Sequence, residues 1–151
     1  MLRYVRIRAV AVGRVKESYF AQAAKEYEKR ISRYAKFEII ETEEEFAPKK
    51  LEKEAKRLLP KLNGFVIVLD KGGEKLSSEE FAERLSKIAL SSGEATFVIG
   101  GSEGLDKTVK ERADMLLSFG AITLPHSLAR VVFEEQIYRA LTIINGGKYH
   151  K

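Results

Sequence analysis

Glycine-rich segments that follow apolar runs are the strongest candidates for chemistry in this chain. They lie at residues 69–73 (LDKGG), 99–101 (IGG) and 119–121 (FGA). Glycine allows a ligand to approach the main chain, where free amides and carbonyls can bind an adenine edge or an amino-acid head group. Each segment by itself is more typical of an ordinary turn. Three such segments at one edge of a sheet would favour a ligand pocket.

The motifs that usually support nucleotide and nucleophilic chemistry are absent. No G-x-G-x-x-G follows the first apolar run, and the sequence has no G-x-x-x-x-G-K-[ST], G-x-S-x-G or H-E-x-x-H motif. There is no cysteine, and His126 and His150 are the only histidines. These counts exclude disulfides, thiolate nucleophiles and Cys-ligated zinc, and they disfavour a His-rich metal site. We therefore expect no metal.

The elements that position these segments alternate between strand-like and helix-like patterns. Residues 77–80 (SSEE) form a capping box, in which Ser77 and Glu80 bind free amides at the start of a helix. The alternation predicts an α/β fold with a mostly parallel sheet flanked by helices, in which ligands bind beyond the carboxyl ends of the strands. Strands are predicted over 4–12, 37–40, 64–70, 95–99 and 115–119, and helices over about 20–34, 51–62, 77–89, 106–114 and 128–144.

Length and composition favour one soluble domain over residues 1–151. The chain has 44% hydrophobic residues, and no apolar run reaches the roughly 18 residues of a membrane span. The N-terminus lacks a signal-peptide pattern, so we expect a cytoplasmic protein without a membrane partner. The net charge of +5 arises in residues 1–75, with 18 Lys or Arg against 12 Asp or Glu. A basic surface favours nucleic acid, although Lys-rich solvated helix faces explain the charge equally well.

The predicted helix 128–144 has apolar residues on two faces. A helix of this kind must be covered on both sides. We predict that a second copy of the chain supplies one cover, which makes the protein a homodimer. The alternative is a central helix that is covered within one subunit. One apolar stripe contains Ile137, Ala140, Leu141 and Ile144, and the other includes Ala129, Val132 and Phe133.

Residues 97–105 and 122–140, together with the ending 149–151 (YHK), resemble the RlmH-type rRNA methyltransferases of the SPOUT superfamily. The first stretch contains IGGSEGL at 99–105, and the second combines TLPH at 123–126 with RV at 130–131 and EQIYRA at 135–140. The likeness extends from residue 9 to the last residue. It implies an α/β-knot with a C-terminal trefoil knot, a homodimer, and S-adenosylmethionine as methyl donor. The implied reaction is methylation at N3 of a pseudouridine in a stem-loop of 23S rRNA on the assembled ribosome.

The resemblance also implies a cofactor site. Gly120 and Ala121 lie in a loop whose residues vary within the family. The side-chain contacts implied at these two positions therefore differ between members, whereas the main-chain contacts do not depend on residue type. The implied residues coincide with the strand ends selected above on physical grounds. Transferred position by position, the site falls on Leu69, Gly100, Phe119, Gly120, Ala121, Ile122, Thr123 and Leu124.

Methyl transfer from a sulfonium is an in-line displacement, so it requires alignment and exclusion of water rather than a covalent nucleophile. The acceptor N3–H is a weak acid, so a base or an electropositive setting should assist its removal. The catalytic candidates are His150 and Tyr149, and only the resemblance raises His150 above an ordinary chain-end residue. His126, between Pro125 and a Ser127 expected to cap the helix, is assigned to packing. Glu103 is assigned no chemistry.

The predicted RNA contacts are cations around the site and in the tail. A flexible cationic tail can become ordered when a polyanion binds. One small domain offers little basic area, so recognition should require both subunits and a large preassembled target. The candidates are Arg130, Arg139, Lys148 and Lys151, with Arg6 or Arg8 as additions.

Two other functions stay open at this point. A non-enzymatic ribosome-associated RNA-binding protein with the same fold would bind no S-adenosylmethionine. An α/β domain that uses another nucleotide is disfavoured because the phosphate-binding motifs are absent.

Overall fold

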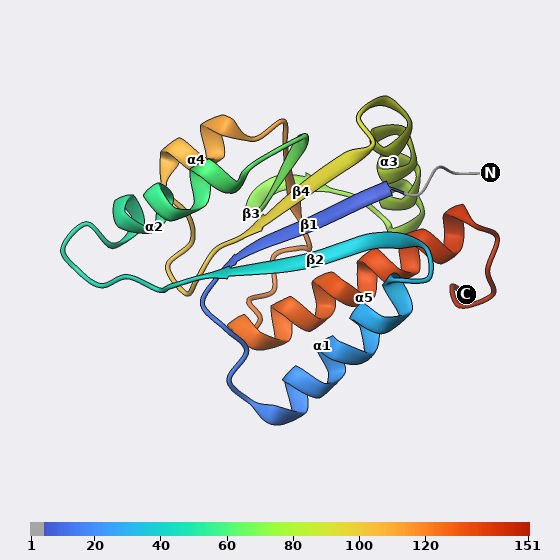
Figure 1. Cartoon of the computed structure of the whole chain (residues 1–151), viewed down its shortest axis with the longest axis horizontal. Coiled ribbons are helices and arrows are strands. Elements are labelled where there is room, and N and C mark those ends of the chain that lie inside the picture. Colours follow the sequence, from blue (N-terminus) through green and yellow to red (C-terminus); the bar gives the residue numbers. More distant parts are fainter. Residues whose placement is uncertain (1–4) are drawn as a thin grey trace.

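The computed structural model describes residues 5–151, so the first residue of the predicted strand 4–12 lies outside the described part. Five parallel strands form one sheet in the order β2-β1-β4-β3-β5, which confirms the predicted α/β fold (Figure 1). The strands are β1 (Val5–Val12), β2 (Ala35–Thr42), β3 (Phe65–Lys75), β4 (Glu94–Ile99) and β5 (Met115–Ser118). The helices are α1 (Ser18–Ile31), α2 (Lys50–Leu58), η1 (Leu59–Lys61), α3 (Ser78–Ser91), α4 (Lys107–Arg112) and α5 (His126–Ile144).

Helices cover both faces of the sheet. α1, α3 and α5 pack on one face, and α2 and α4 pack on the other. Along β3, Ile67 points into the first layer while Val66 and Val68 point into the second. This alternation follows from the two-residue period of a strand and explains why the strand is apolar at successive positions. None of the helices in the described part of the chain is long and apolar enough to cross a membrane.

β3 is longer than predicted because it contains a bulge. Leu69 and Glu74 both lie opposite Leu117, so residues 70–73 project from the sheet between them. A Cβ atom on Gly73 would lie 2.5 Å from the carbonyl carbon of Leu116, so this position requires glycine. The bulge carries the main chain outward at the carboxyl edge of the sheet.

The predicted N-terminal cap is confirmed at α3, and the one predicted at α5 is wrong. The Ser77 hydroxyl accepts a hydrogen bond from the Glu80 amide at 3.0 Å, and the Glu80 carboxylate accepts one from the Ser77 amide at 2.8 Å. α5 begins at His126, two residues earlier than predicted, and Ser127 does not cap it. The Ser127 hydroxyl instead donates to Glu17 at 2.8 Å, which ties α5 to the segment before α1.

α5 is covered largely within its own chain. It lies between α1 and α3 against the sheet, and each of its 19 residues is buried or half-buried (Figure 1). Phe133 packs on Phe97 of β4 with ring centroids 5.1 Å apart, and Ile137 and Leu141 are fully buried. The apolar character of α5 is therefore accounted for mainly by α1, α3 and the sheet. The homodimer stays a prediction.

α5 also buries an unpaired carboxyl group. Glu134 is 0% exposed, and neither of its carboxyl oxygens has a hydrogen-bond partner among residues 5–151. Burial raises the pKa of Glu134 to about 9, and the neighbouring Glu28 carboxyl adds to the shift. The side chain is therefore protonated at neutral pH.

Replacing Glu134 with Gln should remove a pH-dependent loss of stability. Between about pH 5 and pH 8 the folded chain keeps a proton on Glu134 that the unfolded chain releases, so the contribution of this group to the free energy of unfolding falls as pH rises, by up to about 1.4 kcal/mol per pH unit. Glu134→Gln lacks this titrating group, so its free energy of unfolding should increase relative to that of the parent as pH rises. Urea unfolding at both pH values measures the difference. The control is Glu83→Gln, whose carboxylate is 69% exposed on α3. An identical pH dependence in Glu134→Gln and the parent would contradict the assignment.

Candidate functional site

Three strand ends meet at the carboxyl edge of the sheet, as predicted. β3 lies between β4 and β5, so Gly100, the β3 bulge and the segment after β5 are neighbours (Figure 1). The Lys71 ammonium donates a hydrogen bond to the Thr123 hydroxyl at 2.5 Å, which joins the bulge to that segment. We use the name cofactor segment for Leu69, Gly100 and residues 119–124.

The cofactor segment presents exposed apolar side chains beside unpaired main-chain groups. Phe119 is 42% exposed and Ile122 is 82% exposed. The Gly120 amide donates to the Ser118 hydroxyl at 3.1 Å, but within residues 5–151 the amides of 121–124 donate no hydrogen bond. Apolar contacts to a ring and main-chain hydrogen bonds to its edge are the usual means of binding an adenosine group. The residues present therefore fit S-adenosylmethionine.

The turn after β4 is held tightly in place. A Cβ atom on Gly100 would lie 2.8 Å from the Gly104 carbonyl oxygen, and the Gly104 amide donates to the Gly101 carbonyl at 3.1 Å. Asp106 caps α4 by accepting a hydrogen bond from the Thr108 amide at 3.0 Å. The turn can therefore present its main chain to a ligand without rearrangement. Glu103 lies 3.6 Å from Lys50 in an exposed ion pair and remains without a chemical role.

The predicted catalytic residues lie in the C-terminal tail (residues 145–151) and contact α3 and α5 of their own chain. The Tyr149 hydroxyl donates to Glu135 at 3.2 Å. The Nδ1 atom of His150 accepts a hydrogen bond from Arg139 at 2.9 Å, because a guanidinium can only donate, and Nε2 contacts Glu79. Burial and neighbouring Tyr27 and Glu135 raise the pKa of the Tyr149 phenol. This phenol therefore stays protonated at neutral pH and cannot serve as the base.

The structure does not bring the tail and the cofactor segment of one chain together. Among the described residues, the hydrogen bonds, ion pairs and ring contacts of Tyr149 and His150 involve none of the residues of the cofactor segment. In Figure 1 the tail lies at the end of the molecule where β1 and β2 begin, opposite their carboxyl ends. One chain alone thus holds two separate halves of the predicted site.

Two of the four predicted RNA-binding cations are engaged in internal ion pairs. Arg130 has a side chain that is only 5% exposed, and it binds Glu41 at 2.8 Å and the Gly13 carbonyl at 3.4 Å. It therefore fixes α5 to the segment after β1, and its RNA contact stays a prediction. Arg139 binds Glu135 at 2.6 Å and stacks on the Tyr149 ring at 4.9 Å.

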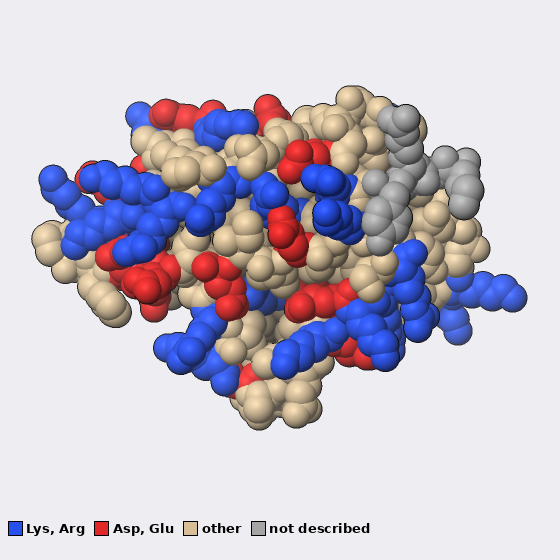
Figure 2. All heavy atoms as spheres, in the orientation of Figure 1, with Lys and Arg blue, Asp and Glu red and all other residues tan. Residues whose placement is uncertain are grey.

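Lys148 and Lys151 are exposed and have no ion pair within residues 5–151. Arg8 pairs with Glu38 and Glu94, and Arg6 lies near the start of β1, away from the carboxyl edge. Figure 2 shows Lys and Arg gathered over α2, with Asp and Glu directly beside them. Acidic side chains therefore border the basic area on the face shown. No group of three or more His, Cys, Asp or Glu in the described part of the chain could hold a metal ion.

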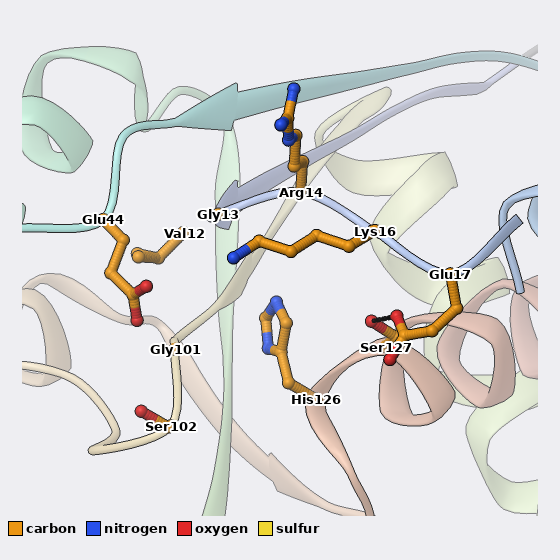
Figure 3. A pocket seen from close by; sticks show the side chains of 10 residues that line it. All are labelled: Val12, Gly13, Arg14, Lys16, Glu17, Glu44, Gly101, Ser102, His126 and Ser127. Atoms are coloured by element: carbon orange, nitrogen blue, oxygen red, sulfur yellow. Dashed lines mark hydrogen bonds between the residues drawn. The ribbon is translucent and has the colours of Figure 1, made fainter.

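A cavity of about 170 Å³ lies at the carboxyl end of β1, and we call it the β1 cavity (Figure 3). This cavity was not predicted from the sequence. The signal was present, since Gly13 follows an apolar strand just as the three selected glycine-rich segments do. The cavity is lined by Val12, Gly13, Arg14, Lys16, Glu17, Glu44, Gly101, Ser102, His126 and Ser127.

His126 points its ring into the β1 cavity. Its Nε2 atom is buried and has no hydrogen-bond partner among residues 5–151, and it lies 3.7 Å from where a Cβ atom of Gly13 would be. Burial, and then the charge of Arg130, lowers the pKa of His126. The imidazole is therefore neutral at neutral pH. The sequence predicted a packing role for His126, and this unpaired nitrogen is the feature that sequence alone could not reveal.

Comparisons with known proteins agree with this architecture. A probable methyltransferase from Bordetella pertussis superposes with a TM-score of 0.61 at 15% identity, covering 91% of this chain and 95% of that one. The SpoU methyltransferase AviRb from Streptomyces viridochromogenes, in complex with the cofactor AdoMet, gives 0.52 at 9% identity, covering 98% and 61%. The ribosomal RNA large subunit methyltransferase H of Caldicellulosiruptor bescii is 52% identical over 153 residues, 96% of this chain and 99% of the relative. A family model described as "Predicted SPOUT methyltransferase" matches residues 5–150, and the chain belongs to this family of SPOUT methyltransferases.

Proposed function

We propose that the protein transfers the methyl group of S-adenosylmethionine to N3 of a pseudouridine in 23S rRNA of the assembled ribosome, in the cytoplasm and as a homodimer. The observation that carries this proposal is the meeting of three strand ends with unpaired main-chain groups in the cofactor segment. The large-subunit rRNA methyltransferase that is 52% identical supports the choice of RNA. We also expect a trefoil knot in the C-terminal part, as the family resemblance implies.

The cofactor, when bound, supplies an electrophilic methyl group. The main chain of residues 119–124 would hold the adenosine group by hydrogen bonds, and Gly100 would allow close approach from the turn after β4. Phe119 and Ile122 would cover the ligand and exclude water, which strengthens electrostatic interactions in the site. The chain therefore contributes alignment and desolvation, the two requirements of an in-line displacement.

The tail completes the site of a second copy in this proposal. Tyr149 and His150 contact α3 and α5 and do not contact the cofactor segment of their own chain. A partner subunit that brings its tail to the cofactor segment would supply His150 as the base for the acceptor N3–H, after the Nδ1 atom has left its hydrogen bond with Arg139. Tyr149 keeps its proton and so orients the substrate or the imidazole by hydrogen bonding.

Cofactor binding tests the cofactor segment directly. Ile122 is 82% exposed, so Ile122→Ser should leave the fold intact and remove apolar contact with the ligand. We expect the Kd for S-adenosylmethionine, measured by isothermal titration calorimetry, to rise about tenfold or more. Leu90→Ser is the control, because Leu90 is 70% exposed on α3. If the parent protein binds no S-adenosylmethionine, the proposed methyltransferase activity is refuted and a non-enzymatic RNA-binding role is favoured.

The target is tested with ribosomes from a strain that lacks the modification. Incubation with the protein and tritiated S-adenosylmethionine should label a single pseudouridine in 23S rRNA, which nuclease mapping locates. A protein-stripped hairpin of the same sequence should react much more slowly, since one small domain offers a limited basic area for binding a free RNA. Equal rates for hairpin and ribosome would show that the assembled ribosome is not the substrate.

The shared site is tested by mixing two inactive variants. His150→Gln should lower kcat by about 100-fold or more through loss of the base, while the Kd for S-adenosylmethionine stays unchanged. Ile122→Asp should abolish cofactor binding and leave the tail intact. Mixed dimers contain one site with both functional halves, so mixing should restore activity. Absence of any recovery in subunits shown to exchange would mean that each tail acts within its own chain.

A further inference from the structure

The β1 cavity adjoins the cofactor segment and is not part of it. The turn after β4 is common to both, because Gly100 belongs to the cofactor segment while Gly101 and Ser102 line the cavity. The rest of the lining comes from the carboxyl end of β1, the segments after β1 and β2, and the first turn of α5 (Figure 3). A ligand in this cavity would lie next to the substrate of the cofactor segment.

The cations of the β1 cavity are unpaired, whereas its carboxylates are engaged. Within residues 5–151, neither Arg14 nor Lys16 forms an ion pair, and Figure 3 shows Lys16 extending its ammonium group across the cavity above His126. Glu44 accepts a hydrogen bond from Lys50 at 3.2 Å. Glu17 accepts one from Ser127 at 2.8 Å, and this bond lowers the pKa of Glu17. Glu44 is balanced by Lys50, while Glu17 stays ionised, so Lys16 is the lining cation that keeps its donors free for a ligand.

His126 adds a buried donor at the same place. A buried polar atom without a partner costs free energy, and a ligand that bonds to it recovers that cost. Since Nδ1 and Nε2 of a neutral imidazole are one donor and one acceptor, the unpaired Nε2 can carry the proton and donate to an oxygen. Lys16, His126 and the Ser102 hydroxyl are therefore donors that an anionic oxygen would satisfy.

The size and surroundings of the cavity select the ligand. At about 170 Å³ it is smaller than the roughly 300–1,000 Å³ pockets that enclose whole small molecules, so it suits one group of a longer molecule. Arg14 lines both this cavity and a second, more open one of about 370 Å³ between α1, β2 and Arg130. In Figure 3 the Arg14 guanidinium points away from the β1 cavity, and it can therefore bind the next unit of a chain that crosses both.

We propose that the β1 cavity binds one phosphodiester group of the RNA strand beside the target nucleotide, through Lys16, His126 and Ser102, while Arg14 binds the neighbouring backbone unit. This rests on the proposed function, because the cavity is placed beside the cofactor segment. Phosphate contacts of this kind fix the register of a nucleic acid without reading its sequence. The site thus positions the strand whose pseudouridine enters the cofactor segment.

Binding is tested by NMR of the two histidine rings, which His150→Gln assigns. The dinucleoside monophosphate UpU should shift the His126 signals saturably, whereas uridine should not, and Lys16→Gln should abolish the shift. Shifts with uridine equal to those with UpU would overturn the proposal in favour of a base site. Shifts with inorganic phosphate that UpU does not reproduce would overturn it in favour of a free-phosphate site. The titration needs neither S-adenosylmethionine nor methyl transfer, so it measures phosphodiester binding at the β1 cavity even if the proposed function is wrong.

The ribosome assay tests the same contact in the substrate. Lys16→Gln should raise KM for ribosomes about tenfold and leave the Kd for S-adenosylmethionine unchanged. The slope of log kcat/KM against log salt concentration should become shallower by about 0.7 to 1, as expected for one lost phosphate contact. Lys29→Gln is the charge-matched control, because Lys29 is exposed on α1. Equal effects of the two substitutions would overturn a specific role for the cavity.

Discussion

Burial of the parallel sheet on both faces is the constraint on which the rest of the structure depends. Val66 and Val68 of β3 enter one apolar layer and Ile67 enters the other, so the strand has no free face. Its main-chain groups are bonded to β4 and β5 along much of its length. Main-chain atoms become available to a ligand only beyond the carboxyl ends. The strand order, with β3 between β4 and β5, therefore determines where the cofactor segment lies, independently of its side chains.

α5 connects the β1 cavity with the C-terminal tail. Its first residue, His126, reaches the β1 cavity, and its later residues Glu135 and Arg139 hold the C-terminal tail. Arg130 fixes the helix by its ion pair with Glu41, and because the guanidinium is buried, its remaining donors must also be bonded to offset the loss of hydration. The Gly13 carbonyl accepts one of those donors. Arg130 thereby couples the placement of α5 to the segment that lines the cavity.

Charge acts locally in this protein. Several cations of the basic N-terminal half are neutralised by neighbours, as in the pairs of Arg8 with Glu38 and Arg57 with Glu45. Cations without an ion pair within residues 5–151 include Arg14 and Lys16 at the β1 cavity and Lys148 and Lys151 in the tail.

The sequence by itself determined the order of strands and helices, the capping box at Ser77 and the glycine-containing strand ends, because each depends on residues close together in the chain. It also contained the motifs of the family. It could not show that the Arg130 side chain is buried, since that burial depends on packing against segments such as the one that carries Glu41, 89 residues away. The β1 cavity and the separation of the tail from the cofactor segment were decided only by the tertiary structure. Whether a polar group is paired, buried or free depends on which distant segments pack against it.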